Sequence, residues 1–434
     1  PDYIDSLLEY TRKQQEHQLL TIDFEAVIEV CDATVSQGEN GTVLQNLLAQ
    51  AEGLGLPEET VARYQQEIRT AYREAFLPSY RKIADTMREL QSGFNNPGGL
   101  AALPDGREYY ELLFAAATAL DESPEAIAQL AEQRLDKAIS RLGGLAFLYP
   151  DAYNAWLEGQ YTTPFTSYEE MLLHLDKATD GSFPAVGELS YVIDPIPADV
   201  ANSGVAAYFI NPAVDERDAL RIRVNTEHTE ELGALGTFTT LAHEGIPGHM
   251  YAAAYSHQNL QSDFRKVTAS QIGYNEGYAT YVELLSLGYL EELGIPEPVL
   301  KMERLNTEVT CCLVTMMDIA VNYEGLSREE FAEAFGDYFD PAFADYYYDM
   351  MRLEPTAYLS YYAGWLKLEQ LREKAERELG GQFTELGFHA AILQSGSVPY
   401  FIVERNVNAW IEATRAESAP AAGEEIPDEP ASAA

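Results

Sequence analysis

The stretch Leu241-Ala-His-Glu-Gly-Ile-Pro-Gly-His-Met-Tyr251 is the segment around which we expect the whole chain to be organised. It places His243, Glu244 and His249 within seven residues. A zinc-dependent hydrolase needs neutral imidazoles that hold the ion, and a carboxylate that takes a proton from the metal-bound water. These side chains are therefore candidates for two zinc ligands and a general base.

The spacing of the two histidines predicts a break in the helix that carries them. They are six positions apart, whereas the familiar zinc-protease helix carries its histidines four apart on one face. Six residues of regular helix leave the second imidazole roughly 120° away from the first. Pro247 removes a helical hydrogen bond and Gly248 permits unusual backbone angles, so we expect a kink that turns His249 back toward His243. The alternative interpretation is that His243-Glu244 is an ordinary solvated helix face and that Pro-Gly simply marks a helix end.

A second run, Gly273-Tyr-Asn-Glu-Gly-Tyr-Ala-Thr-Tyr-Val-Glu283, offers a third ligand. Glu276 lies 27 residues beyond His249, and a Glu on a following helix often completes such a site. Glu283 is two helical turns further along, so both carboxylates share one face. We predict that Glu276 binds the metal, and that Glu283 orients a ligand histidine by accepting its other ring proton.

The two runs resemble bacterial domain-of-unknown-function family 885, whose members are similar to zincin-type, gluzincin-like metallopeptidases. The resemblance extends over residues from about 70 to 405 and includes Leu103-Pro-Asp-Gly-Arg-Glu-Tyr-Tyr-Glu-Leu-Leu113, Tyr358-Leu-Ser-Tyr-Tyr-Ala-Gly364, Phe388-His389 and Gly396-Ser-Val-Pro399. Met250 stands where relatives often have a further histidine. The resemblance implies a zinc peptidase with a zincin-like fold and Zn²⁺ as its cofactor.

Charge and hydrophobicity limit the partners. The chain has 434 residues with 70 acidic and 28 basic side chains, a net charge of −42, which disfavours nucleic acid or anionic lipid as a partner. No apolar run approaches the ~20 residues that a bilayer span needs. We therefore predict no nucleic-acid partner and no membrane partner. The sequence carries no signal for an oligomeric state.

Cysteine usage predicts a reducing, cytoplasmic location. Cys31, Cys311 and Cys312 all lie in apolar stretches, a pattern that does not favour a disulfide framework. The chain begins with Pro1 and has no initiator Met, so we interpret it as a truncated or processed piece.

Periodicity predicts a mainly α (α+β) fold. Residues 1–92 read as a helical N-terminal part, residues 93–415 as a zincin-like catalytic region continuous with it, and residues 416–434 as a disordered acidic, Ala- and Pro-rich tail. Within the catalytic region, helices are expected at 108–120, 126–142 with Ser123 as N-cap, and 366–379 with Gly380-Gly381 as the end.

Two short segments, 205–210 and 220–224, are expected to be strands of a small sheet next to the zinc-site helix. An edge strand there could hold an extended peptide by strand addition. The sheet could equally be structural, and the sequence leaves both interpretations open.

Tyrosines and two other side chains are further candidates. Tyr361 is the predicted catalytic donor to the oxyanion, with Tyr358 and Tyr362 as competitors and substrate contacts, although tyrosines are also common packing residues. Arg372 could bind a substrate carboxylate, or pair with neighbouring acids. His389 could be a catalytic transition-state donor, or a core histidine that fixes the following turn.

These features predict a zinc-dependent hydrolase, a metallopeptidase of carboxypeptidase or oligopeptidase type that acts on a peptide or small amide substrate. Two alternatives stay open. One is a zinc amidase or esterase that acts on a non-peptide substrate, and the other is a non-catalytic helical binding protein that retains the motif.

Overall fold

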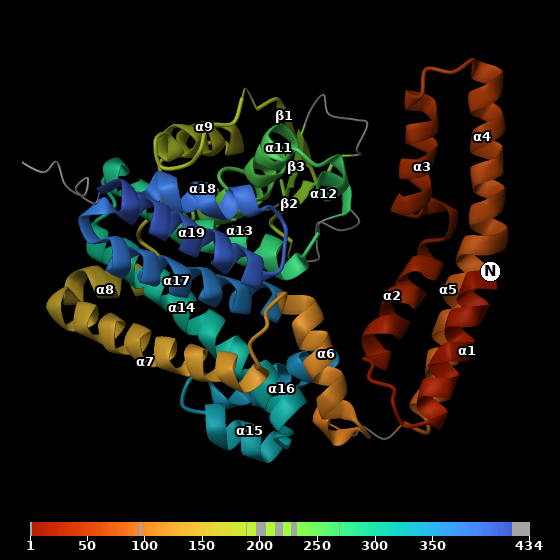
Figure 1. Cartoon of the computed structure of the whole chain (residues 1–434). Coiled ribbons are helices and arrows are strands. Elements are labelled where there is room, and N and C mark those ends of the chain that lie inside the picture. The colour runs from red at the N-terminus through yellow and green to blue at the C-terminus, as the bar shows by residue number, and fades with distance from the viewer. Residues whose placement is uncertain are drawn as a thin grey trace, which may run out of the picture.

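The protein is built mainly from helices, with one small three-stranded sheet (Figure 1). The computed structural model describes residues 2–94, 98–187, 189–196, 205–212, 220–226, 232–268 and 270–418. The predicted mainly α class with a small sheet is therefore confirmed. Within the described ranges, no helix combines the length and the apolarity that a bilayer span requires.

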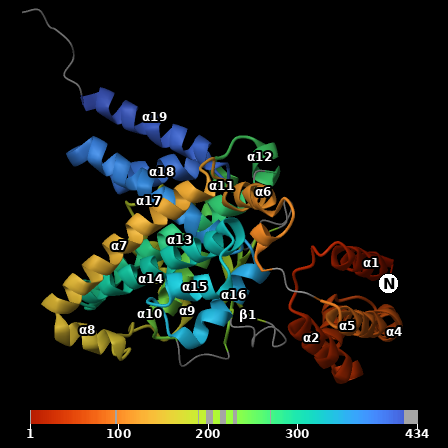
Figure 2. The same cartoon turned by 90° about the horizontal axis from the view of Figure 1, so that it is seen from below.

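The N-terminal helices form an elongated group beside the remaining structure (Figures 1 and 2). Their apolar faces pack into two small clusters, one around Phe24 and Met87 and the other around Leu44 and Tyr72. The helices of this group are α1 (Asp2–Glu16), α2 (Phe24–Gln37), α3 (Thr42–Gly53), α4 (Glu58–Ala71) and α5 (Leu77–Gln91).

The rest of the chain surrounds one large apolar core. Its helices are α6 (Gly106–Thr118), α7 (Pro124–Leu148), α8 (Pro150–Leu157), α9 (Tyr168–Thr179), α10 (Leu235–Glu244), α11 (His249–Asn259), α12 (Asp263–Thr268), α13 (Ile272–Ser286), α14 (Glu297–Ile319), α15 (Arg328–Phe335), α16 (Ala344–Leu353), α17 (Leu359–Leu379), α18 (Glu385–Ser395) and α19 (Tyr400–Ser418).

Local signals located several of these helices correctly. The Ser123 side chain accepts a hydrogen bond from the Ala126 backbone and so caps α7, as predicted. Helix α17 ends at Gly380, which has a positive φ. It begins at Leu359 rather than at the predicted residue 366, because Leu359, Ala363 and their neighbours are buried and the helix continues into the core.

The sheet has the strand order β1-β3-β2, with β1 (Tyr191–Pro195) parallel and β2 (Ala207–Ile210) antiparallel to the central β3 (Leu220–Val224). The two predicted strands are confirmed, whereas β1 was not predicted. Ile222 and Val224 of β3 are buried in the main core, which fixes the sheet against the helices.

A buried ion network joins three core helices that lie side by side in Figures 1 and 2. Arg134 of α7 contacts Glu308 of α14 at 2.8 Å and Glu369 of α17 at 3.1 Å. Arg304 contacts the same two carboxylates at 2.9 and 2.7 Å. The network fixes the register of α7, α14 and α17.

The end of the chain differs from its prediction in part. Helix α19 continues to Ser418, so the first residues of the predicted disordered tail, 416–418, are helical. Residues 419–434 lie outside the described residues.

Candidate metal centre

The two histidines lie on either side of a helix break, as the Pro-Gly pair predicts. Helix α10 ends at Glu244 and α11 begins at His249, and the Ile246-Pro247 bond between them is cis. The Gly248 N–H donates to the Ala242 carbonyl at 2.9 Å. A Cβ at position 248 would overlap the backbone carbonyls of His243 and Ala242, so only glycine fits this close approach.

The break brings the chemical groups of the motif together. Ligand atoms of His243, Glu244 and His249 lie within 4.8 Å of one another, and the two imidazole centroids are 4.9 Å apart. The Tyr278 hydroxyl donates to the Pro247 carbonyl at 2.8 Å and so ties the break to α13. The local kink therefore carries a compact cluster rather than a solvated face.

Glu276 of α13 completes the cluster. One of its carboxylate oxygens, Oε2, lies 3.4 Å from His243 Nε2 and 3.3 Å from His249 Nε2. Glu244 Oε1 is farther, 4.0 Å from His243 Nε2. Glu276 is therefore the carboxylate that contacts both imidazoles, and Glu244 stands beside them. Two imidazole nitrogens and one carboxylate are a donor set typical of catalytic zinc.

Glu283 contacts the other ring nitrogen of His243. Its Oε2 lies 2.9 Å from His243 Nδ1, so it accepts the proton on that ring nitrogen. The Nε2 atom is then left facing Glu276 and His249. A carboxylate of this kind fixes both the tautomer and the orientation of a metal-binding histidine.

The electrostatics of the cluster favour a bound cation. Burial alone would lower the pKa of His243, but hydrogen bonds to Glu276 and Glu283 raise it to about 10. Burial would raise the pKa of Glu276, but both histidines lower it to about 2. Glu244, Glu276 and Glu283 thus surround two imidazoles with an excess of negative charge, which a divalent cation would compensate.

Glu244 is held by the edge of the sheet, a contact that the sequence did not predict. The Phe209 backbone N–H donates to Glu244 Oε2 at 2.7 Å. The Asn225 N–H donates to the Ala206 carbonyl, so in the antiparallel pattern the Phe209 N–H points to the free edge of β2. This edge faces the centre, as strand addition requires, but its central donor already binds Glu244.

Two cavities meet at the centre. The larger, about 490 Å³, is lined by Tyr208, Phe209, His249 and Glu276 among others, and the smaller, about 250 Å³, by His243, Glu283 and several threonines. Glu244 and Tyr361 line both. A ligand could therefore reach the cluster from two sides.

Among the three tyrosine candidates, Tyr361 lies at the centre. Its ring stacks on His243 with centroids 6.1 Å apart. Burial, and then the charges of Glu276 and Glu244, raise its pKa to about 12, so the phenol stays protonated at neutral pH. Tyr362 lines only the smaller cavity, and Tyr358 stacks on Tyr362 outside the described lining of both.

Close packing of α13 and α17 accompanies the position of Tyr361 beside His243. A Cβ at Gly277 of α13 would overlap the Gly364 backbone of α17, and a Cβ at Gly364 would overlap the Gly273 carbonyl. These glycines allow the two helices to approach closely, and Tyr361 lies one turn before Gly364. The two glycines of the Gly-Tyr-Asn-Glu-Gly pattern indicated a close approach of another helix, but the sequence did not identify that helix.

The structure does not place His389 and Arg372 among the described residues that line the two cavities, so nothing in the structure brings them to the metal centre. His389 is 0% exposed, lies 2.7 Å from the Ser182 carbonyl and 2.9 Å from the Tyr281 hydroxyl, and burial lowers its pKa to about 4. Arg372 pairs with Glu385 and donates to the Tyr281 hydroxyl at 2.7 Å. The open alternatives, a core histidine and an internally paired arginine, fit this environment.

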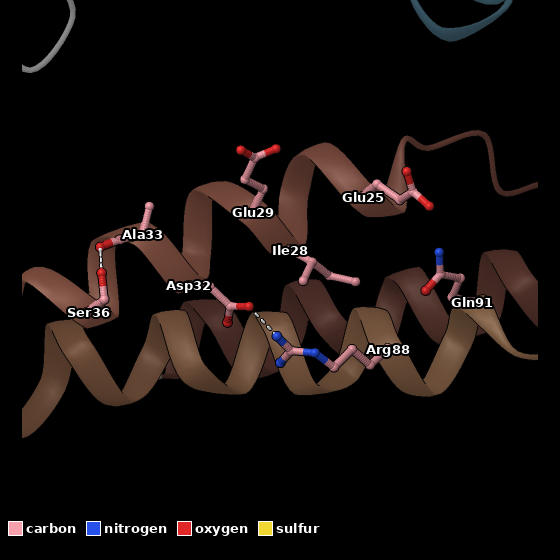
Figure 3. Close-up of a pocket in the computed structure, with 8 residues that line it drawn as sticks. All are labelled: Glu25, Ile28, Glu29, Asp32, Ala33, Ser36, Arg88 and Gln91. Carbon is pink, nitrogen blue, oxygen red and sulfur yellow. Dashed lines mark hydrogen bonds and ion pairs between the residues drawn. The ribbon is translucent and has the colours of Figure 1, made fainter.

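A separate hollow of about 690 Å³ lies between α2 and α5 (Figure 3). Glu25, Glu29 and Asp32 line it from α2, and Arg88 of α5 pairs with Asp32. Its described lining contains no histidine, and one of its acids is already neutralised by an arginine. It therefore does not compete with the cluster on α10, α11 and α13 as a metal site.

Comparisons with known proteins identify a family and a shared fold. The family described as bacterial protein of unknown function (DUF885) matches residues 1–407. No curated protein matches the chain. The chain resembles the crystal structure of a "putative lipoprotein" from Colwellia psychrerythraea, with 19% identity and a TM-score of 0.79 over 94% of this chain and 74% of that one.

The chain also resembles the structure of "a putative lipoprotein of unknown function" from Shewanella oneidensis. The identity is 18% and the TM-score is 0.58 over 87% of this chain and 72% of that one. At such identities the likeness concerns the fold alone.

Proposed function

The chain belongs to the DUF885 family of bacterial proteins, and from this premise we propose that it is a zinc-dependent hydrolase, a metallopeptidase with a zincin-like catalytic region. One observation carries the proposal. Glu276 Oε2 lies within 3.4 Å of His243 Nε2 and His249 Nε2, while Glu244 stands beside them and lines both cavities. We therefore assign Glu276 as the carboxylate that binds the metal and Glu244 as the carboxylate that exchanges protons.

The proposed role of each side chain follows from its position. Zinc held by His243, His249 and Glu276 would supply a Lewis acid and an acidified water molecule. Glu244 takes the proton from the attacking water and passes it to the leaving amine. The Phe209 N–H keeps the Glu244 carboxylate in place.

Tyr361 has a different task. Its phenol lines both cavities and remains protonated at neutral pH, so it can donate a hydrogen bond to the oxygen that becomes negative when water attacks the amide. Glu283 keeps the His243 ring oriented throughout.

Metal analysis tests the proposal directly. We expect about one equivalent of zinc in the protein purified without chelator, and its loss in His243→Ala and Glu276→Ala, because each removes one of three ligands. Mass spectrometry measures the metal, with His17→Ala, at an exposed residue just after α1, as the matched histidine control. Because ligand imidazoles must be neutral, zinc affinity should also fall as the pH falls. A parent protein that binds no zinc even after reconstitution would contradict the proposal.

Tyr361→Phe should lower kcat about 10²-fold or more, because it removes one oxyanion donor while keeping the ring. The zinc content should not change, since the phenol is not a ligand. Steady-state kinetics on a cleaved peptide would measure the loss. Tyr358→Phe, one turn earlier on the same chain segment, is the control, and equal losses in the two variants would refute the assignment.

The cytoplasmic location remains a prediction. The two similar structures described above are of proteins titled "putative lipoprotein", which favours the cell envelope as the alternative location. Fractionation of cells that express the full-length gene, followed by immunodetection, distinguishes the two.

A further inference from the structure

Among the described residues, one strongly cationic side chain lines the larger cavity. Lys266 of α12 is the one Lys or Arg among the described residues that line either cavity. Its side chain is only 14% exposed, yet it pairs at 3.4 Å with Asp263, which is 92% exposed. An ion pair with one member in solvent contributes little, so this ammonium group can exchange Asp263 for another anion.

The wall that carries Lys266 is fixed by neighbouring contacts. Arg265 donates to the Ser395 carbonyl, and the Gln271 N–H donates to Ser397 Oγ at 2.7 Å. Gly396 and Ser397 also line the cavity. The segment that carries Lys266 is therefore joined to the loop between α18 and α19.

The charges in this cavity are segregated. Glu244 and Glu276 belong to the metal centre on α10 and α13, whereas Lys266 comes from the separate helix α12. The protein as a whole carries a net charge of −42, which repels anions. Besides the proposed zinc ion, Lys266 is the cationic group among the described lining residues that could retain an anionic part of the substrate.

We propose that Lys266 binds a carboxylate of the substrate, so that the centre acts on peptides with a free carboxylate close to the cleaved bond. The C-terminal carboxylate is one source of this group and an acidic side chain is the other. The cleavage part rests on the proposed hydrolase function, but carboxylate binding by Lys266 does not.

The proposal is tested by measuring peptide binding to a variant that is expected not to cleave the peptide. Calorimetry on Glu244→Gln protein compares N-acetyl-Ala-Ala-Phe with its C-terminal amide, and with an amidated peptide that carries Glu in place of Phe. We expect a ligand with a carboxylate to bind about tenfold or more tightly than the plain amide, as is typical of a hydrogen bond to a charged group. A preference for the free acid alone identifies the C-terminus, and tight binding of the amidated Glu peptide identifies a side chain.

Variants assign the effect. Lys266→Gln should abolish the carboxylate preference, Lys266→Arg should retain most of it, and Lys301→Gln, at an exposed lysine of α14, should leave it unchanged. Equal binding of all three peptides, or a preference that survives Lys266→Gln, would overturn the inference. If the carboxylate preference depends on Lys266 but the protein cleaves no peptide, this inference stands and the peptidase proposal is refuted. If the protein cleaves peptides without the preference, the peptidase proposal stands and this inference is refuted.

Discussion

Replacing Glu244 by Gln should lower kcat by about 10²–10⁴-fold while the zinc content stays at the parent value. The amide cannot take a proton from water, but its carbonyl oxygen can still accept the hydrogen bond that the Phe209 N–H donates to Glu244. The geometry of the helix break should therefore survive. Single-turnover kinetics and metal analysis on the same preparation would measure both quantities.

The control for this variant is Glu297→Gln on the exposed first turn of α14, which makes the same chemical change outside the cavities. It should leave both kcat and zinc unchanged. Substantial residual turnover in Glu244→Gln would remove Glu244 from the role of general base. Loss of zinc in that variant would instead make Glu244 a ligand.

Replacing Glu308 by Leu should reduce the free energy of unfolding by about 3–5 kcal/mol, because it breaks a buried ion network by removing one partner. Glu308 is buried and contacts both Arg134 and Arg304, which would lose a shared counter-charge. Urea denaturation at neutral pH would measure the loss as a lower midpoint.

The acid dependence of this stability has a defined sign. Burial would raise the pKa of Glu308, but Arg134 and Arg304 lower it below its ordinary value of 4.5. A carboxylate whose pKa is lower in the folded state stabilises the protein above the unfolded pKa, and this contribution is lost as the pH falls through the folded pKa. The difference between parent and Glu308→Leu should therefore shrink below about pH 4.

Lys301→Leu on the same helix is the control for the buried network. Lys301 belongs to an ion pair with Glu297 in which both side chains are more than half exposed. Such pairs contribute about 0–1 kcal/mol, so the midpoint should move little. Equal destabilisation by the two variants would contradict a special role for the buried network.

The residues of the centre were predicted from the sequence with uneven success. His243, Glu244, His249, Glu276 and Glu283 lie together in the structure as their spacing suggested. His389 is held inside the core by the distant Ser182, whereas the partly buried Arg372 pairs with Glu376 and Glu385. The sequence pattern around a residue carries no information about partners that come from distant segments.

Some structural features were set by the sequence alone. Pro247 and Gly248 end a helix because one lacks a backbone donor and the other has no Cβ to collide with the preceding turn. Ser123 caps α7 and Gly380 ends α17 through contacts within a few residues. These outcomes depend on near neighbours, so the local order of residues decides them.

The positions of the candidate side chains were decided only by the tertiary structure. Tyr361 stacks on His243 and lines both cavities, whereas Tyr362 lines only one and Tyr358 neither. This arrangement depends on the close approach of α13 and α17 that Gly277 and Gly364 allow. The position of Lys266, the contact between Phe209 and Glu244, and the parallel strand β1 likewise join segments far apart in the chain. Such pairings depend on how apolar faces pack into a common core, which residues close together in sequence cannot determine.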